Sequence, residues 1–163
     1  MAPLHLWVRA EERPNEARVG ITAEGVATLL EHGIAVTVED SPARAIPTDA
    51  YRAAGATIAG PGSWRQAPAE TVVFGLKELR ADATPLIHRH IMFGHAYKGQ
   101  AEGRLLLDRF AAGGGTLYDL EYLVDETGGA IRFVYEPSGV APLIDSFRFS
   151  PTGKYWLTYR SVE

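Results

Sequence analysis

Short apolar runs alternate with helix-like segments along most of the chain. The runs are rich in branched and aromatic residues and are only a few residues long, which is typical of buried strands. Six strands are therefore predicted, at residues 4–9, 34–38, 56–58, 71–76, 90–94 and 116–120.

Three segments between these runs have the spacing of amphipathic helices. Thr22 and Thr48 are the predicted N-caps of the first two, because a hydroxyl there accepts a hydrogen bond from the first turn. Gly33 and Gly55 are expected to end them, since glycine suits the residue after a helix. The third helix is predicted over residues 100–112 and is closed by a run of three glycines.

Strands that alternate with helices predict an α/β fold with a parallel sheet and helices on both faces. The expected architecture is Rossmann-like, of the flavodoxin type, over residues 1–130. The pattern changes after this point, where aromatic residues alternate at 147–149 and 155–159 around a turn at 150–153. Residues 131–163 are therefore predicted to form a β-rich tail with a C-terminal β-hairpin.

Ionisable residues follow two of the predicted strands directly. Lys77 and Glu78 come after the fourth strand, and His95 comes after the fifth. Parallel sheets carry their chemistry outside the carboxyl ends of the strands, so these groups are expected on one rim. An amine and an imidazole there suit acid–base work on a small polar substrate, although a solvated ion pair and a structural loop histidine are the alternatives.

Composition narrows the range of functions. The 163 residues carry a net charge of −4, which gives no reason to expect nucleic acid or membrane as a partner. There is no cysteine, so disulfides and thiolate chemistry are excluded. No metal site is expected, because His88 and His90 have no third ligand at a sensible spacing. With neither a spanning segment nor a signal peptide recognised, a cytoplasmic location is expected.

Several segments, taken in order, resemble the N-terminal substrate domain of NAD-dependent, lysine-forming saccharopine dehydrogenase. This family belongs with alanine dehydrogenase and the transhydrogenase N-terminal domains. The resemblance covers residues 9 to about 125 and rests on the segments 9–11, 14, 16–18, 38–42, 51–56, 62–64, 67–68, 75–78, 93–98 and 115–121. It implies lysine metabolism, in which saccharopine, NAD and water give lysine, 2-oxoglutarate and NADH.

The resemblance also implies roles for individual residues. Lys77 would be the base for the secondary amine, and His95 would activate the water that attacks the imine. Arg18 would bind a substrate carboxylate, for which its planar fork is suited. The resemblance also implies four further residues of the substrate site, which would tune the charge and the hydrogen bonding there. They are Glu16, Glu78, Lys98 and Glu121. Arg18 and Glu16 could instead form only a surface pair.

The cofactor half of the family is not recognised in this sequence. No GxGxxG motif follows the resembling region, and residues 113–115 end a helix, whereas that motif opens one. The NAD-binding Rossmann domain is therefore expected to be absent, and turnover by this chain alone is not expected. Alternatives are a non-catalytic module that binds an amino acid or dicarboxylate, and an inactive remnant whose tail caps the lost interface. A separate NAD-binding domain or self-association are the expected protein partners.

Overall fold

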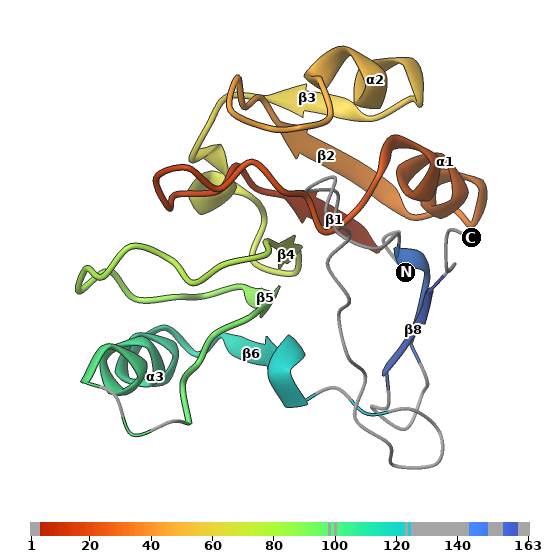
Figure 1. Cartoon of the computed structure of the whole chain (residues 1–163). Coiled ribbons are helices and arrows are strands. Elements are labelled where there is room, and N and C mark those ends of the chain that lie inside the picture. Colours follow the sequence, from red (N-terminus) through yellow and green to blue (C-terminus); the bar gives the residue numbers. More distant parts are fainter. Residues whose placement is uncertain are drawn as a thin grey trace.

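A six-stranded parallel sheet forms the body of the molecule (Figure 1). The computed structural model describes residues 4–97, 99, 101–122, 124, 144–149 and 155–159. The strands are β1 (His5–Val8), β2 (Ala35–Glu39), β3 (Thr57–Ala59), β4 (Val72–Phe74), β5 (Arg89–Met92) and β6 (Thr116–Asp119), in the order β3-β2-β1-β4-β5-β6. All six overlap the predicted runs, so the fold class is confirmed.

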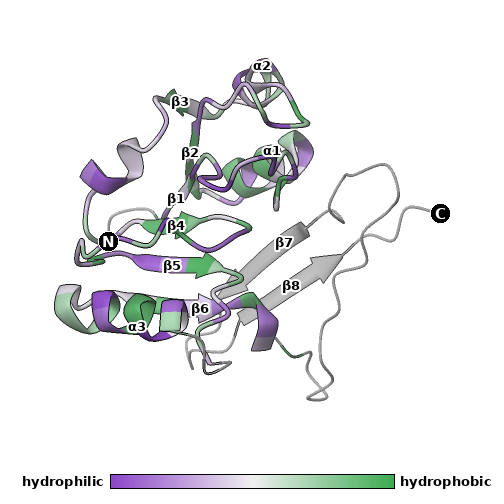
Figure 2. Cartoon of the chain, turned by 60° about the vertical axis from the view of Figure 1, so that its left-hand side comes forward, coloured by the Kyte–Doolittle hydropathy of each residue, from purple (hydrophilic) through white to green (hydrophobic). Residues whose placement is uncertain are grey.

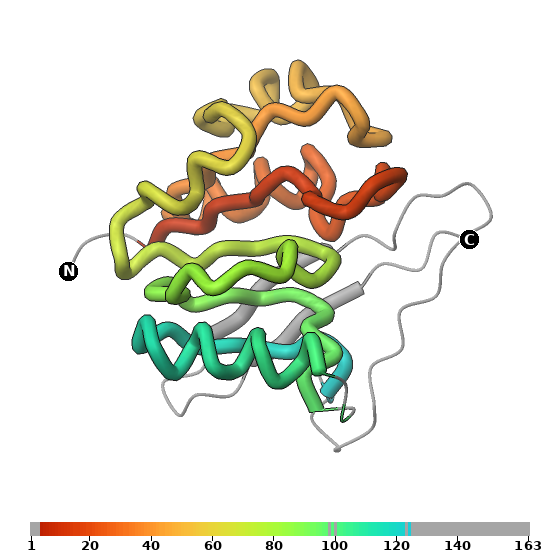
Figure 3. The backbone as a smooth tube through the Cα atoms, turned by 90° about the vertical axis from the view of Figure 1, so that its left-hand side faces the viewer, coloured from red at the N-terminus to blue at the C-terminus, as the bar shows by residue number. Residues whose placement is uncertain are grey.

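Helices cover both faces of this sheet, as predicted. The α-helices are α1 (Ala23–Glu31), α2 (Thr48–Ala53) and α3 (Ala101–Gly113), and the short 3-10 helices are η1 (Ser63–Gln66) and η2 (Leu120–Tyr122). Figure 1 shows α1 and α2 on one side of the strands and α3 on the other, and Figure 3 shows α3 in front of them. The buried apolar side chains form two clusters. One lies between the sheet and helices α1 and α2, and the other lies between the sheet and α3.

Alternation along the strands explains why two clusters form. Successive side chains of a strand point to opposite faces, so Val72 and Phe74 lie in the first cluster and Val73 in the second. In β5 the character changes along the strand, from Arg89 and His90 to apolar Ile91 and Met92 (Figure 2). The inner strands β2, β4 and β5 are buried on both faces, whereas the edge strands β3 and β6 are partly exposed.

One predicted helix cap is confirmed and one is wrong. The hydroxyl of Thr22 accepts the N–H of Gly25 at 3.2 Å, and Gly33 follows α1 with a φ of 77°. At α2 the N-cap position is Pro47, which makes no side-chain cap. The Thr48 hydroxyl donates to Oδ1 of Asp40 instead, at 2.6 Å, and so ties α2 to the end of β2.

The direction in which the chain crosses the sheet reverses beside β1. The chain runs outward from β1 through β2 to β3, then returns to β4 and runs the other way to β6. The exits of β1 and β4 therefore diverge at a topological switch point, which is where open α/β sheets bind ligands. The loop that follows β1 and the loop that begins at Gly75 lie at this point.

A two-stranded antiparallel hairpin follows the sheet, as predicted. It consists of β7 (Ile144–Phe149) and β8 (Tyr155–Tyr159), and β7 contacts α1. The predicted turn at residues 150–153 lies outside the described residues. The boundary at residue 130 also lies outside them and stays a prediction. Within the described part of the chain, no helix has the length and apolar character needed to cross a membrane.

Candidate active site

The exits of β4 and β5 place the segments that carry the predicted acid–base residues next to each other. These strands are neighbours, with Phe74 opposite Ile91. Their pairing continues beyond the strands, because the N–H of Gly75 donates to the carbonyl of Ile91 at 3.0 Å and the N–H of Phe93 donates to that of Leu76 at 3.1 Å. The segments that carry Lys77, Glu78 and His95 are therefore held side by side.

His95 lies between two carboxylates. Its Nδ1 is 3.7 Å from Oε2 of Glu78, and its Nε2 is 4.0 Å from Oε1 of Glu121. The imidazole is partly open to solvent, with 32% of the side chain exposed. Its backbone has a φ of 50°, a left-handed conformation that is uncommon for any residue with a side chain and often marks a functional position. Both distances are longer than a hydrogen bond, so the two carboxylates act on the ring through their charge.

Asp119, at the end of β6, fixes the positions of both His95 and Glu121. Its Oδ1 accepts the N–H of Gly94 and the N–H of Glu121, each at 3.1 Å. The space at Gly94 is tight, since an added Cβ would lie 3.0 Å from Cδ2 of Leu117 and 3.3 Å from Oδ2 of Asp119. One carboxylate therefore holds the turn before the imidazole and the acid beside it. The predicted strand 116–120 includes Asp119, so the pattern alone did not place this carboxylate at the strand exit.

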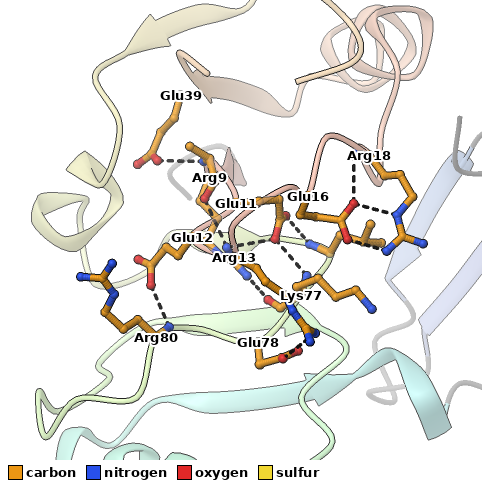
Figure 4. Close-up of polar contacts among 12 residues, drawn as sticks. Arg9, Glu11, Glu12, Arg13, Glu16, Arg18, Glu39, Lys77, Glu78 and Arg80 are labelled. Carbon is orange, nitrogen blue, oxygen red and sulfur yellow. Dashed lines mark hydrogen bonds and ion pairs between the residues drawn. The ribbon is translucent and has the colours of Figure 1, made fainter. Parts of the chain in front are cut away.

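Arg18 and Glu16 form a forked ion pair in the loop after β1. Nε of Arg18 donates to Oε1 of Glu16 at 2.7 Å, Nη2 pairs with Oε2, and the Glu16 side chain is only 7% exposed. The hydrogen bonds from Arg18 lower the pKa of Glu16 against the opposing effect of burial, and the Lys77 charge lowers it further. In Figure 4, Lys77 points toward this pair. Arg18, Glu16 and Lys77 thus form one group.

A cavity of about 390 Å³ opens on the other side of the β4 exit, toward α3. Glu78 and His95 line it, whereas Lys77 is not among its lining residues. The charged residues of its wall carry both signs: Glu12, Arg13, Glu78, Arg80, Glu102 and Arg109. The described predicted residues thus fall into two groups. Lys77, Glu16 and Arg18 form one, and the other consists of Glu78 and His95 in the wall of the cavity with Glu121 beside His95.

Three further residues of the loop after β1 are built into this rim (Figure 4). Nη1 of Arg13 donates to Oε1 of Glu78 at 3.0 Å. Glu12 accepts the side chain of Arg65 at 2.9 Å and the N–H of Arg80 at 2.8 Å. The third residue is Glu11, whose carboxylate accepts two N–H groups of the loop after β4. The signal for all three was the density of charge over residues 10–18.

Two other features were singled out in the sequence. Lys98, predicted to contact substrate, lies outside the described residues. His88 and His90 are buried beneath η1 and α3, with ring centroids 6.2 Å apart, and burial lowers the pKa of His90 to about 3. The described residues contain no group of three potential ligands that could hold a metal ion.

The fold and the strand-exit residues define an α/β domain that carries charged side chains and an imidazole at the exits of its central strands. A family model described as "Alanine dehydrogenase/PNT, N-terminal domain" matches residues 7–141, and the chain belongs to this family. In L-alanine dehydrogenase the fold recurs with a TM-score of 0.64 and 21% identity, over 78% of this chain and 35% of that one. In a transhydrogenase from Sinorhizobium meliloti the TM-score is 0.58 at 22% identity, over 76% and 36% of the two chains.

Curated relatives with higher identity carry the name saccharopine dehydrogenase [NAD(+), L-lysine-forming]. The protein of Yarrowia lipolytica is 41% identical over 154 residues, which are 93% of this chain and 42% of that protein. The protein of Candida albicans is 45% identical over 128 residues, which are 78% of this chain and 34% of that protein. The chain therefore spans well under half the length of these relatives.

Proposed function

We propose that this chain is the substrate-binding part of an NAD-dependent saccharopine dehydrogenase. The observation that carries the proposal is the imidazole of His95 between Glu78 and Glu121, one strand away from Lys77. The similarity to saccharopine dehydrogenases supports the same assignment. The substrate is an amino acid with several carboxylates, and the mixed charges of the rim suit such a molecule.

In the proposed reaction Lys77 acts first. Its neutral Nζ takes the proton of the secondary amine that links the two halves of saccharopine. A lysine must be neutral for this step, and nearby positive charge or burial favours that form. Glu16 contributes a negative charge close to Lys77, but Arg18 balances it through the forked pair. Because the Glu16 carboxylate is paired with Arg18, the Lys77 amine does not lie next to an unpaired carboxylate.

His95 acts on water in the second half of the reaction. The imine would form when a hydride acceptor, held outside the described residues, takes hydride from the carbon beside the amine nitrogen. The ring of His95 then takes a proton from a water molecule as the oxygen attacks the imine carbon. The ring returns this proton to the nitrogen, which gives the carbinolamine. The hydroxyl proton of the carbinolamine then passes through the ring to the nitrogen as the C–N bond breaks, and lysine and 2-oxoglutarate are released. Glu78 and Glu121 lie on either side of the ring and stabilise the positive charge that it carries between these transfers. The open face of the imidazole allows water to reach it.

Arg18 is the proposed anchor for a carboxylate of the dicarboxylate half. Its side chain is 28% exposed and pairs with Glu16, so the residue is accessible from solvent. A guanidinium holds a carboxylate through two parallel hydrogen bonds, which fixes the orientation as well as the position of the substrate. Lys98 is proposed to add a positive charge on the same rim.

NAD is the cofactor named for the relatives, and the described residues do not fit its pyrophosphate. At the switch point the N–H groups of Leu76 and Lys77 are already taken by the carboxylate of Glu11. A negative side chain where a dinucleotide needs free N–H donors would repel a pyrophosphate. We therefore assign no redox step to these residues, and their part is to bind substrate and move protons.

Binding and turnover test this proposal separately. Calorimetric titration with saccharopine and with 2-oxoglutarate should show binding, and Arg18→Lys should weaken it about tenfold because the fork is lost. Arg52→Lys on the exposed face of α2 is the matched control and should bind normally. NADH should form when NAD, saccharopine and the remaining part of the Yarrowia lipolytica enzyme are added to the chain.

The outcomes also separate the proposal from its alternative, a binding module without redox chemistry. Ligand binding with no NADH in the complemented assay would favour the module. Absence of heat with both ligands would contradict any site on this rim.

A further inference from the structure

We propose that Arg9 and Glu11 are positioning residues that hold the backbone of Lys77 on both sides, at its N–H and at its carbonyl. The inference rests on the proposed function only for what Lys77 does. The geometry of the hold, which we call the Arg9–Glu11 clamp, stands on its own contacts. Neither residue needs to touch substrate, since both act through the backbone that carries the amine.

Glu11 holds the N–H side of this peptide. Its Oε1 accepts the N–H of Leu76 at 2.6 Å, and its Oε2 accepts the N–H of Lys77 at 3.0 Å. The two residues are adjacent at the exit of β4, and the carboxylate spans both donors at once. Hydrogen bonds to a charged acceptor are about twice as strong as neutral ones, so this contact restrains the loop more than a water molecule would.

Arg9 holds the carbonyl side. Its Nη2 donates to the carbonyl of Lys77, and its Nη1 donates to Oε2 of Glu11 at 3.3 Å. The Arg9 side chain is fully buried at the end of β1. A buried guanidinium requires partners, and here the partners are the Lys77 carbonyl, the Ala10 carbonyl and the Glu11 carboxylate.

Position 75, at the start of this loop, has to be glycine for the clamp to exist. A Cβ added to Gly75 would lie 2.3 Å from Cζ and from Nε of Arg9. Any side chain at that position would therefore push the guanidinium away from the Lys77 carbonyl. The Gly75-Leu76-Lys77-Glu78 segment is thus matched to a residue at the end of a different strand.

The clamp is anchored in the interior through Glu39, a fully buried carboxylate at the end of β2. Oε2 of Glu39 accepts the N–H of Ala10 at 2.9 Å, and its Oε1 accepts the N–H of Trp64 at 2.7 Å. The peptide between Arg9 and Glu11 is therefore fixed to the sheet and to η1. A reaction that moves a proton to Lys77 needs the amine placed within a fraction of an ångström, and a rigid backbone provides this.

The test uses Glu11→Gln, which keeps the shape of the side chain and removes its charge. Glu31→Gln at the exposed end of α1 is the matched control. The chain has three lysines, Lys77, Lys98 and Lys154, so carbon-13 reductive methylation gives a resolved NMR signal for Lys77, assigned with Lys77→Arg. Amide hydrogen exchange at Leu76 and Lys77 reports the two hydrogen bonds directly.

We expect Glu11→Gln to speed exchange at Leu76 and Lys77 by about tenfold or more. The methyl signal of Lys77 should move toward that of a freely rotating lysine, while amides of β2 and β3 are unaffected. Gly75→Ala should move the same signal without changing any charge. In the complemented assay kcat should fall more than KM rises, because a misplaced amine still allows binding.

Three results would overturn the clamp. One is an unchanged Lys77 signal in Glu11→Gln, and another is a change no larger than in Glu31→Gln. The third is faster exchange throughout the sheet, which would show a general structural role. Failure of the proposed function is a separate outcome, because the NMR readout needs neither substrate nor turnover. If Gly75→Ala does not fold, Glu11→Gln alone decides the matter.

Discussion

Oε2 of Glu78 lies 3.7 Å from Nδ1 of His95, so a carboxylate and an imidazole join the exits of β4 and β5. Glu78→Gln would keep the shape of this contact and remove its charge. We expect turnover in the complemented assay to fall about tenfold, because the charge that supports the imidazolium during water attack is lost. A rate equal to that of the unchanged chain would show that Glu78 serves only to pair with Arg13.

Lys77→Met should separate chemistry from folding. Lys77 is only partly buried and its clamp contacts come from the backbone, so the melting temperature should change little. Turnover should fall to background, because methionine has no nitrogen to take a proton. Circular dichroism with thermal melting measures the first effect and NADH absorbance the second. A variant that does not fold would indicate a structural role for Lys77.

Stability should depend on pH through His90. Burial, followed by the charges of Arg9 and nearby groups, lowers the pKa of His90 to about 3. Between about pH 6.5 and pH 3 the unfolded chain therefore binds a proton that the folded chain does not. The free energy of unfolding should fall by about 2 kcal/mol from pH 7 to pH 5 through this group. Urea unfolding at both pH values measures it.

His90→Phe should remove that part of the pH dependence. The ring packs against Trp64 at 5.0 Å and Phe110 at 5.4 Å, so an aromatic replacement suits the site. The matched control is His32→Gln, on an exposed histidine at the end of α1, and it should keep the dependence. An unchanged slope in His90→Phe would contradict the assignment to His90.

The two threonines at the starts of α1 and α2 should differ in their effects. Thr22→Ala removes a side-chain cap and should lower the free energy of unfolding by about 1 kcal/mol. Thr48→Ala removes only an exposed hydrogen bond to Asp40, so a smaller change is expected. Chemical unfolding of the two variants gives the comparison. Equal losses would mean that Thr48 contributes as much as a true cap.

The strands and the two-sided helix packing could be predicted because the information is local. Short apolar runs ending in polar residues specify a parallel sheet, and Gly33 and Gly55 end the first two helices with φ values of 77° and 99°. The cap at Thr48 could not be judged in this way. Its hydroxyl prefers a carboxylate eight residues earlier, a contact that only the fold creates.

Part of the candidate site could also be predicted from local sequence, and part of it depends on contacts that only the fold creates. Lys77, Glu78 and His95 follow strands, so the edge of the sheet to which they belong is fixed by the pattern alone. The role of Glu11 depends on a contact with Leu76 and Lys77 across 65 and 66 residues of sequence. Glu11 and Glu12 are neighbours in the charged loop after β1, and nothing in the local sequence distinguishes the role of one from that of the other.

The most direct test of the central claim, that Lys77 and His95 serve one substrate, is an NMR titration of the chain with saccharopine. The backbone amide signals of Lys77 and His95 should shift together, with a single dissociation constant, while that of His32 at the far end of α1 stays in place. Shifts at only one of the two residues, or at neither, would contradict the claim.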